Sequence, residues 1–329
     1  MGTIRVATPS DYDLPRDACS YGYFVLAPNY WDVRAKVLWR VLDVNTRGVL
    51  AKVSQPAGPG TPLKVWTGES LDKAETIEVK HQLTRMLRLD EAAASIAEFH
   101  RLDPRYAKTG RGRLLRSPTL FEDVIKTVTS CNVTWPSTMQ MNRRLCEVLG
   151  KRAKTPEGAP QAHAFPTPSK LSRVRAATLR ARCRVGYRDA RLIELARLFT
   201  LAPAKGGIDE AWLSDPATSD EEVFGALVEL PGIGPYAAAN IMQLLGRYSR
   251  LPLDTESVRH GRSVLGMKGT SAQIMRRVKR HFAPFGAHAF RSYWFEVWEL
   301  YEGRHGPSWT WDRDHTGKLF TASALNKAK

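Results

Sequence analysis

The chain has 329 residues, and its 49 Lys and Arg against 33 Asp and Glu give a formal net charge of +16. Its 43% hydrophobic content excludes wholesale disorder, and no run of about 18 apolar residues predicts a membrane span. A basic excess favours a polyanionic partner, most commonly nucleic acid, although charge alone leaves that question open.

Four cysteines are scattered along the chain: Cys19, Cys131, Cys146 and Cys183. None forms a C-x2-C pair, so the spacing predicts reduced thiols, no zinc ribbon and no iron–sulfur cluster. We therefore expect that no cofactor is required. The first residues contain no apolar stretch of signal-peptide length, and we expect a soluble, intracellular protein of the cytoplasm or nucleoid, or of a eukaryotic nucleus.

The front of the chain, residues 1–113, is predicted to form a β-rich domain. Runs of β-branched and aromatic residues occupy 21–26 (YGYFVL), 37–44 (VLWRVLDV) and 49–53 (VLAKV), and a Gly/Pro stretch separates them from LKVWTG at 63–68. Such runs, separated by turn residues, are typical of an antiparallel sheet.

Apolar residues at helical spacing begin at about residue 83 and continue through a predicted helical body, residues 114–303. Ser117 is expected to cap the first helix of this body, with Pro118 in its first turn. The remaining residues, 304–329, form a predicted basic C-terminal tail. The sequence thus predicts an α+β fold, in which an antiparallel β-rich domain precedes an all-α body. Later helices are expected at 220–229, 236–246, 254–265, 271–282 and 287–301.

One of the later helices carries a basic cluster, formed by Arg276, Arg277, Lys279 and Arg280. Runs of like charge are most often solvated helix faces, and we adopt that interpretation.

The segment LPGIGPYAAANIMQLL, residues 230–245, places two glycines between two predicted helices. Gly232 and Gly234 allow positive φ angles and a close approach of the backbone to another molecule. Ile233 is expected to point inward, and Pro235 to occupy the first turn of the next helix. Because helix starts bind phosphates, the segment predicts a helix–hairpin–helix grip on a nucleic-acid backbone, with a purely structural corner as the alternative.

Asp254 follows Gly234 by twenty positions and begins the next predicted helix. Taken alone, this residue has the pattern of a helix N-cap. The succession of a glycine hairpin, one helix and an acid is a rarer combination. The N–H groups of the helix start are expected to keep the carboxylate ionised.

This combination resembles the helix–hairpin–helix (HhH-GPD) DNA glycosylase superfamily, in which a Gly/Pro-rich hairpin precedes an essential aspartate. Three other segments are similar to the same family: FEDVIKTVTSCNVTW (121–135), FPTPSKL (165–171) and VGYRDARLIELA (185–196). GRLLRSPTLFE resembles the junction between the β-domain and the helices in the branch that repairs oxidised or alkylated purines. The resemblance covers about residues 114–301 and implies base excision repair by a monomer acting on double-stranded DNA that contains a damaged base.

The resemblance also implies roles for individual residues. Asp254 would be the catalytic carboxylate, which stabilises the positive charge of a sugar that is losing its base. Gly232, Ile233, Gly234 and the amide of Tyr236 would hold a DNA phosphate, and a monovalent cation would sit at the hairpin carbonyls.

Three side chains are candidates for contacts that form when a base is flipped out of the duplex. Asn132 would lie near the space that the base vacates, and capping of its own helix is an equal alternative. Trp135 and Tyr236 are candidates for the base pocket, although core packing is preferred for Trp135. Arg188 is expected to pack between helices rather than to contact phosphate.

Departures from the family pattern limit the predicted chemistry. Bifunctional members carry a lysine where this chain has Tyr236, and tyrosine cannot form a Schiff base with the sugar. Members with an iron–sulfur cluster carry four closely spaced C-terminal cysteines, whereas none follows Cys183 here. The resemblance therefore implies a monofunctional N-glycosylase without lyase activity.

Two other classes of protein remain open. The chain could be a DNA-binding protein that has lost catalysis, or a DNA-base-modifying protein on a glycosylase scaffold. Among damaged purines, alkylated bases are preferred over oxidised guanine, because the sequence contains no recognisable signature of oxidised-guanine recognition. The nine tryptophans could supply the aromatic walls that stack on electron-poor bases.

Overall fold

The computed structural model describes residues 2–313 and residue 316, and it divides into two compact units. Most of the predicted basic tail lies outside the described residues. The domain boundaries at 113 and 303 stay predictions. In the described part of the chain, no helix combines the length and apolar character that a bilayer crossing needs. Unit 1 consists of residues 2–91, Arg113–Asp209 and the described residues from Pro307 on, and unit 2 of Ala92–Gly112 and Glu210–Gly306.

Unit 1 contains a five-stranded sheet that is antiparallel throughout, in the order β1-β5-β4-β3-β2. The prediction of an antiparallel sheet, and with it the α+β fold class, is confirmed. The three inner strands match predicted runs, whereas the edge strands β1 and β2 are additional to the prediction. The strands are β1 (Gly2–Val6), β2 (Asn29–Asp32), β3 (Val37–Val44), β4 (Arg47–Ser54) and β5 (Leu63–Thr67).

A two-residue turn that begins at Asn45 joins β3 to β4. Asn45 has a φ of 51°, a left-handed conformation that asparagine adopts more readily than most residues. The turn sets the register that places Val41 opposite Leu50. Both side chains are buried in a cluster with Ala153, so the register determines which face of the hairpin enters the core.

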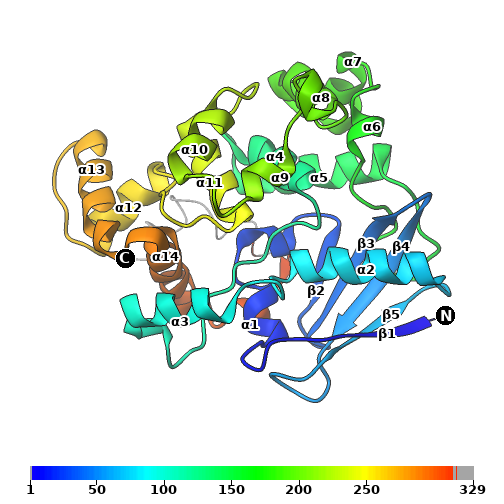
Figure 1. Ribbon diagram of the computed structural model, residues 1–329, viewed down its shortest axis with the longest axis horizontal. Helices are drawn as coiled ribbons and strands as arrows, with labels where there is room; N and C mark the ends of the chain where they lie inside the picture. The colour runs from blue at the N-terminus through cyan, green and yellow to red at the C-terminus, as the bar shows by residue number, and fades with distance from the viewer. Residues whose placement is uncertain (1, 314–315, 317–329) are drawn as a thin grey trace. The chain divides into compact units, whose positions relative to one another are not determined.

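Helix α2 (Lys73–Met86) lies across the sheet and contacts β3 and β1 (Figure 1). It begins with a capping box, in which Asp72 accepts the N–H of Glu75 at 2.8 Å and Glu75 accepts the N–H of Asp72 at 3.1 Å. Val79 and Leu83, four positions apart, are fully buried. The helix therefore starts ten residues before the sequence predicts helical spacing, because its first two turns are mainly polar.

A buried ionic cluster joins the sheet to helix α4 (Leu120–Ser130). Glu122 on α4 pairs with Arg40 on β3 at 2.6 Å and with Lys126 at 2.7 Å, and all three side chains are nearly inaccessible. Burial alone raises the pKa of Glu122, but Arg40 and Lys126 together hold it below its usual value. Removing one partner of such a cluster strands a buried charge, which costs about 3–5 kcal/mol. The cluster thus fixes α4 against the sheet.

Two local predictions in unit 1 are wrong. Residues 21–26 form a 3-10 helix, η1 (Gly22–Val25), instead of a strand. The side chains of η1 are buried on every side, and a short apolar run does not distinguish a strand from a buried helical turn. Thr119, not Ser117, caps α4 and accepts an N–H of its first turn at 3.2 Å. The N–H of Ser117 donates instead to Asp123 Oδ1 at 2.7 Å.

Short helices make up much of the rest of unit 1. α6 and α8 pack against each other, as do α4 and α5. These further helices are α1 (Leu14–Ala18), α5 (Trp135–Leu149), α6 (Pro168–Leu171), α7 (Ala176–Thr178), the π-helix η3 (Leu179–Cys183), η4 (Gly186–Arg188), α8 (Asp189–Leu198), η5 (Pro203–Lys205) and η7 (Ser308–Thr310).

Unit 2 is helical over its described residues. Its core includes Phe99, whose ring stacks on Tyr106 with centroids 5.6 Å apart and lies 5.9 Å from the ring of Phe295. The helices predicted from residue 220 onward are confirmed, with ends shifted by a few residues. The helices are α3 (Ala93–Leu102), η2 (Pro104–Tyr106), α9 (Glu210–Ser214), α10 (Asp220–Val228), α11 (Pro235–Leu245), α12 (Thr255–Ser263), α13 (Ser271–Phe282), η6 (Ala283–His288) and α14 (Ala289–His305).

Candidate active site

The glycine segment forms a tight turn between α10 and α11. Gly232 has a φ of 76°, which requires a residue that tolerates the left-handed region. Gly234, the N-cap of α11, is extended with a φ of −92°, and a Cβ built on it would meet nothing within 4 Å. Ile233 is only 3% exposed, which confirms its predicted inward direction, and its N–H donates to the Leu230 carbonyl at 3.0 Å. The two glycines thus serve different purposes: the first allows the turn, and the second keeps the start of α11 open to an approaching group.

Asp254 is the N-cap of α12, and its side chain is half-buried. Its Oδ1 atom accepts the backbone N–H groups of Glu256 at 2.9 Å and of Ser257 at 3.1 Å. Its Oδ2 atom accepts no hydrogen bond from any residue that the structure describes. The predicted capping role is confirmed, and it occupies one oxygen of the carboxylate.

The pKa of the Asp254 carboxyl is raised to about 6. Burial is the largest cause, the nearby charge of Glu256 acts in the same direction, and the N–H of Ser257 acts against both. The helix start therefore favours the ionised form, as expected from the sequence, but burial outweighs it. At pH 7 the carboxylate still predominates, and a pKa near the working pH suits a general base.

A hydrogen bond joins the first turn of α12 to α14. Ser257 Oγ lies 2.9 Å from the hydroxyl of Tyr293, which is buried among aromatic side chains. The Tyr293 ring meets Phe282 edge-on, with centroids 5.4 Å apart, and His260 at 5.9 Å. Burial raises the pKa of Tyr293 well above its ordinary value, so it stays a neutral phenol. This part of α14 therefore packs in the core of unit 2.

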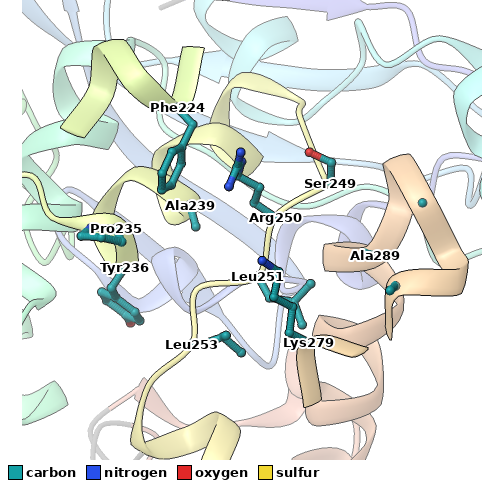
Figure 2. A pocket seen from close by; sticks show the side chains of 12 residues that line it. Phe224, Pro235, Tyr236, Ala239, Ser249, Arg250, Leu251, Leu253, Lys279 and Ala289 are labelled. Carbon is teal, nitrogen blue, oxygen red and sulfur yellow. The ribbon is translucent and has the colours of Figure 1, made fainter. Parts of the chain in front are cut away.

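A cavity of about 440 Å³ brings the hairpin and the Asp254 segment of unit 2 together. In Figure 2, Pro235 and Tyr236 of α11 lie on one side of it, and Leu251 and Lys279 lie across from them. Leu253, the residue before Asp254, also lines it. The wall thus combines apolar and aromatic groups with two cations, Lys279 and Arg250.

The two candidates in unit 1 lie close together in sequence but differ in environment. Asn132 is exposed in the turn between α4 and α5, with a left-handed φ of 53° directly after the C-cap of α4. Trp135, the first residue of α5, is half-buried, and its ring packs against the backbone of Gly22. Trp135 therefore has the packing contact that the sequence favours. Its role in a base pocket, like that of Tyr236, stays a prediction.

Tyr187 is a further candidate for a functional-site residue, and the sequence alone does not single it out. Its ring is 58% exposed, and the guanidinium of Arg188 lies 4.5 Å from the ring centroid. Arg188 itself is buried and donates to the carbonyls of Val128 and Cys131, which confirms that it packs. The structure identifies Tyr187 as an exposed ring beside a basic segment. The sequence shows the basic segment but not the exposure of the ring.

Metal-binding side chains do not cluster in this chain as far as it is described. Groups of three or more His, Cys, Asp or Glu side chains that could hold an ion are absent from residues 2–313 and 316. Burial raises the pKa of two thiols, that of Cys183 to about 11 and that of Cys146 further. The monovalent cation at the hairpin stays a prediction.

Comparisons with solved structures match this fold over most of the chain. The structure of MBOgg1 in complex with a low-affinity DNA ligand is 18% identical, with a TM-score of 0.66, and the match covers 91% of this chain and 97% of that one. The 3-methyladenine DNA-glycosylase of Archaeoglobus fulgidus is 17% identical, with a TM-score of 0.62, over 89% of this chain and 97% of the other.

A third match is the 8-oxoguanine glycosylase/lyase of Clostridium acetobutylicum, 18% identical with a TM-score of 0.60, over 84% of this chain and 92% of that one. No protein-family model and no curated protein matches the sequence. The chain therefore has the fold of the helix–hairpin–helix DNA glycosylases, as the sequence resemblance implies.

Proposed function

We propose that this protein is a monofunctional DNA glycosylase that removes a damaged purine from duplex DNA in base excision repair. The observation that carries the proposal is the carboxylate of Asp254, which has a pKa of about 6 and an Oδ2 atom without a protein partner in the described chain. This carboxylate belongs to the same compact unit as the glycine hairpin.

The reaction breaks the bond between C1′ of the sugar and the nitrogen of the base, and the bonding electrons leave with the base. Positive charge then develops on C1′ and O4′, and the Asp254 carboxylate stabilises it. A water molecule attacks C1′ and gives a proton to Asp254, for which a pKa of about 6 is suitable. The products are the free base and an abasic sugar in an intact strand.

The hairpin would hold the DNA while the base leaves the stack. The exposed Gly232, Gly234 and Pro235 present the start of α11 to a phosphate, where backbone N–H groups and the helix dipole favour an anion. Such a contact fixes the position of the duplex without reading its sequence. Extrusion of a base costs a few kcal/mol, and Asn132, exposed in unit 1, is proposed to fill the space left behind.

The absence of lyase activity follows from Tyr236. This residue occupies the position at which bifunctional relatives carry a lysine, and a phenol has no amine with which to attack C1′. We therefore propose that the strand stays unbroken after base removal. Water, and not a side chain of the hairpin helix, is the nucleophile.

Among purine lesions, alkylated bases are the preferred substrates. The cavity beside the hairpin is lined by two aromatic side chains, Phe224 and Tyr236. Aromatic side chains attract electron-poor and cationic bases. Oxidised guanine is the second candidate.

The test is a panel of duplexes, each with one damaged purine, incubated with excess protein and scored for abasic sites with and without alkali. We expect strand breaks only after alkali, no covalent complex on treatment with borohydride, and no product with Asp254→Asn. Glu256→Gln, which removes the neighbouring acid, is the matched control and should keep activity. DNA binding without base release from any lesion would favour the catalytically altered alternative, and breaks without alkali would refute the monofunctional mechanism.

A further inference from the structure

Helix α13 presents a basic face that its own unit does not neutralise. The helix buries Ile274, Val278 and Phe282 completely, and its sequence contains no acid. The opposite side carries four exposed cations: Arg276, Arg277, Lys279 and Arg280.

These cations lack acidic partners within the described chain. Arg277 donates to the carbonyl of Lys268 at 2.9 Å, and no ion pair involves any of the four. Other arginines of unit 2 are paired, for example Arg247 with Asp220 at 2.8 Å. Like charges three and four positions apart on a helix repel one another, so an anion bound along this face would relieve that repulsion.

Lys279 links this face to the cavity at the hairpin. It lines the cavity across from Tyr236 (Figure 2), and no acid lines the cavity among the described residues. The second cation there, Arg250, lies 4.1 Å from the ring centroid of Phe224 and pairs with Glu221, whose side chain is 83% exposed. The cavity is therefore continuous with the hairpin on one side and with the basic face on the other.

We propose that the basic face of α13, together with Lys279 at the cavity, is a second contact with the DNA backbone, separate from the phosphate seat at the hairpin. A helix of twelve residues is about 18 Å long, which matches the axial rise of about five phosphates of one strand. The exposed guanidinium and ammonium groups bind phosphate oxygens regardless of base sequence. The inference rests on the proposed function, because it takes duplex DNA as the ligand.

Other polyanionic surfaces fit this face less well. Insertion into a lipid surface requires an apolar face, and the apolar face of α13 is fully committed to the core of unit 2. An acidic peptide would not explain why the charge extends to the cavity beside the hairpin. Duplex DNA accounts for both features.

The experiment measures the affinity of the full chain for an undamaged duplex at several salt concentrations. Wild type is compared with Lys279→Gln and with the triple variant Arg276→Gln/Lys279→Gln/Arg280→Gln. The slope of log K against log salt is negative, and its magnitude should decrease by about 0.9 for each lost phosphate contact. The triple variant should therefore lose about 2–3 from the magnitude of the slope. Lys205→Gln removes one exposed charge from unit 1 and should leave the slope unchanged.

The outcomes separate this inference from the proposed function. A triple variant with the slope of wild type would overturn the inference, and if Gly234→Ala weakens binding in the same assay, the proposed hairpin grip would still stand. Failure of the wild-type protein to bind duplex DNA would instead overturn the proposed function. A slope that falls equally in Lys205→Gln would show a general effect of net charge and overturn the assignment to α13. Thermal unfolding of each variant confirms that it is folded.

Discussion

Asp254 and Ser257 exchange hydrogen bonds at the start of α12: Oδ1 of Asp254 accepts the N–H of Ser257 at 3.1 Å, and Ser257 Oγ accepts the N–H of Asp254 at 3.2 Å. This reciprocal pair fixes the orientation of the carboxyl group and leaves Oδ2 outside the capping box. Capping and catalysis are therefore compatible roles for Asp254. The cap sets the geometry in which the second oxygen could meet a substrate.

The rate of base excision should depend on pH through the Asp254 carboxyl. With a pKa of about 6, the rate should rise as pH increases through 6 and level off above pH 7. At pH 5 about one molecule in ten carries the carboxylate, so single-turnover excision should be about tenfold slower than on the plateau. Saturating protein at each pH removes effects on binding. A rate that is constant down to pH 4.5 would contradict the raised pKa.

Asp254→Asn and Asp254→Ala should separate the cost of burial from the value of the cap. Asparagine accepts the same N–H groups, whereas alanine loses a cap worth about 1 kcal/mol, so Asp254→Asn should be the more stable variant by that amount. Burial raises the folded-state pKa of Asp254 to about 6, against about 3.9 in the unfolded chain. Wild type should therefore lose stability relative to Asp254→Asn as the pH rises from 4 to 6. Above pH 6 the difference should stay constant, at no more than about 3 kcal/mol. Chemical denaturation at pH 4, 6 and 8 measures both effects, and equal stabilities of the two variants would contradict the capping role.

The longer elements could be predicted from the sequence, and the short or weakly patterned ones could not. Helix α13 has the predicted bounds because its apolar residues recur at the helical period. Strand β3 also has the predicted bounds, because it is an eight-residue run rich in valine and leucine. The edge strands β1 and β2 have five and four residues, and their formation depends on a neighbouring strand rather than on their own pattern. Segment 21–26 is apolar at nearly every position, so its period carries no information.

The candidate site likewise contains some residues that the sequence could predict and others that it could not. Gly232 and Asp254 stand out because a turn and a helix start demand particular residues locally. Lys279 and Phe224 reach the cavity from helices far apart in the chain, and only tertiary packing brings them together. The pKa of Asp254 also depends on burial by distant segments, so the sequence could indicate the effect of the helix start but not the larger opposing effect.

Substitution of the two hairpin glycines by alanine should give opposite results. Gly232→Ala forces a left-handed φ on a residue with a Cβ and should cost about 1–2 kcal/mol of unfolding free energy. Gly234→Ala has an ordinary φ and no neighbour within 4 Å, so stability should change by less than about 1 kcal/mol. Its methyl group would nevertheless stand where a phosphate approaches the start of α11, so duplex affinity should fall. Denaturation and binding titrations check the pair, and wild-type affinity in Gly234→Ala would contradict the hairpin grip.

Asn132→Gly isolates the side chain that is proposed to fill the space of a flipped base. Asn132 has a φ of 53°, which glycine adopts without strain, so this change deletes the side chain and keeps the backbone of the turn. Excision from a duplex should slow by roughly tenfold, equivalent to about 1.4 kcal/mol, because the vacated stack loses its substitute. Excision of the same lesion from a single strand should not change, since no stack has to be filled.

Asn45→Gly is the matched control, because Asn45 has a similar φ of 51° in the turn between β3 and β4. It should leave excision from both substrates at the wild-type rate. The ratio of duplex to single-strand rates is the informative quantity, since a loss of folded protein lowers both rates equally. An unchanged ratio in Asn132→Gly would mean that Asn132 only ends α4, which is the capping alternative that the sequence leaves open.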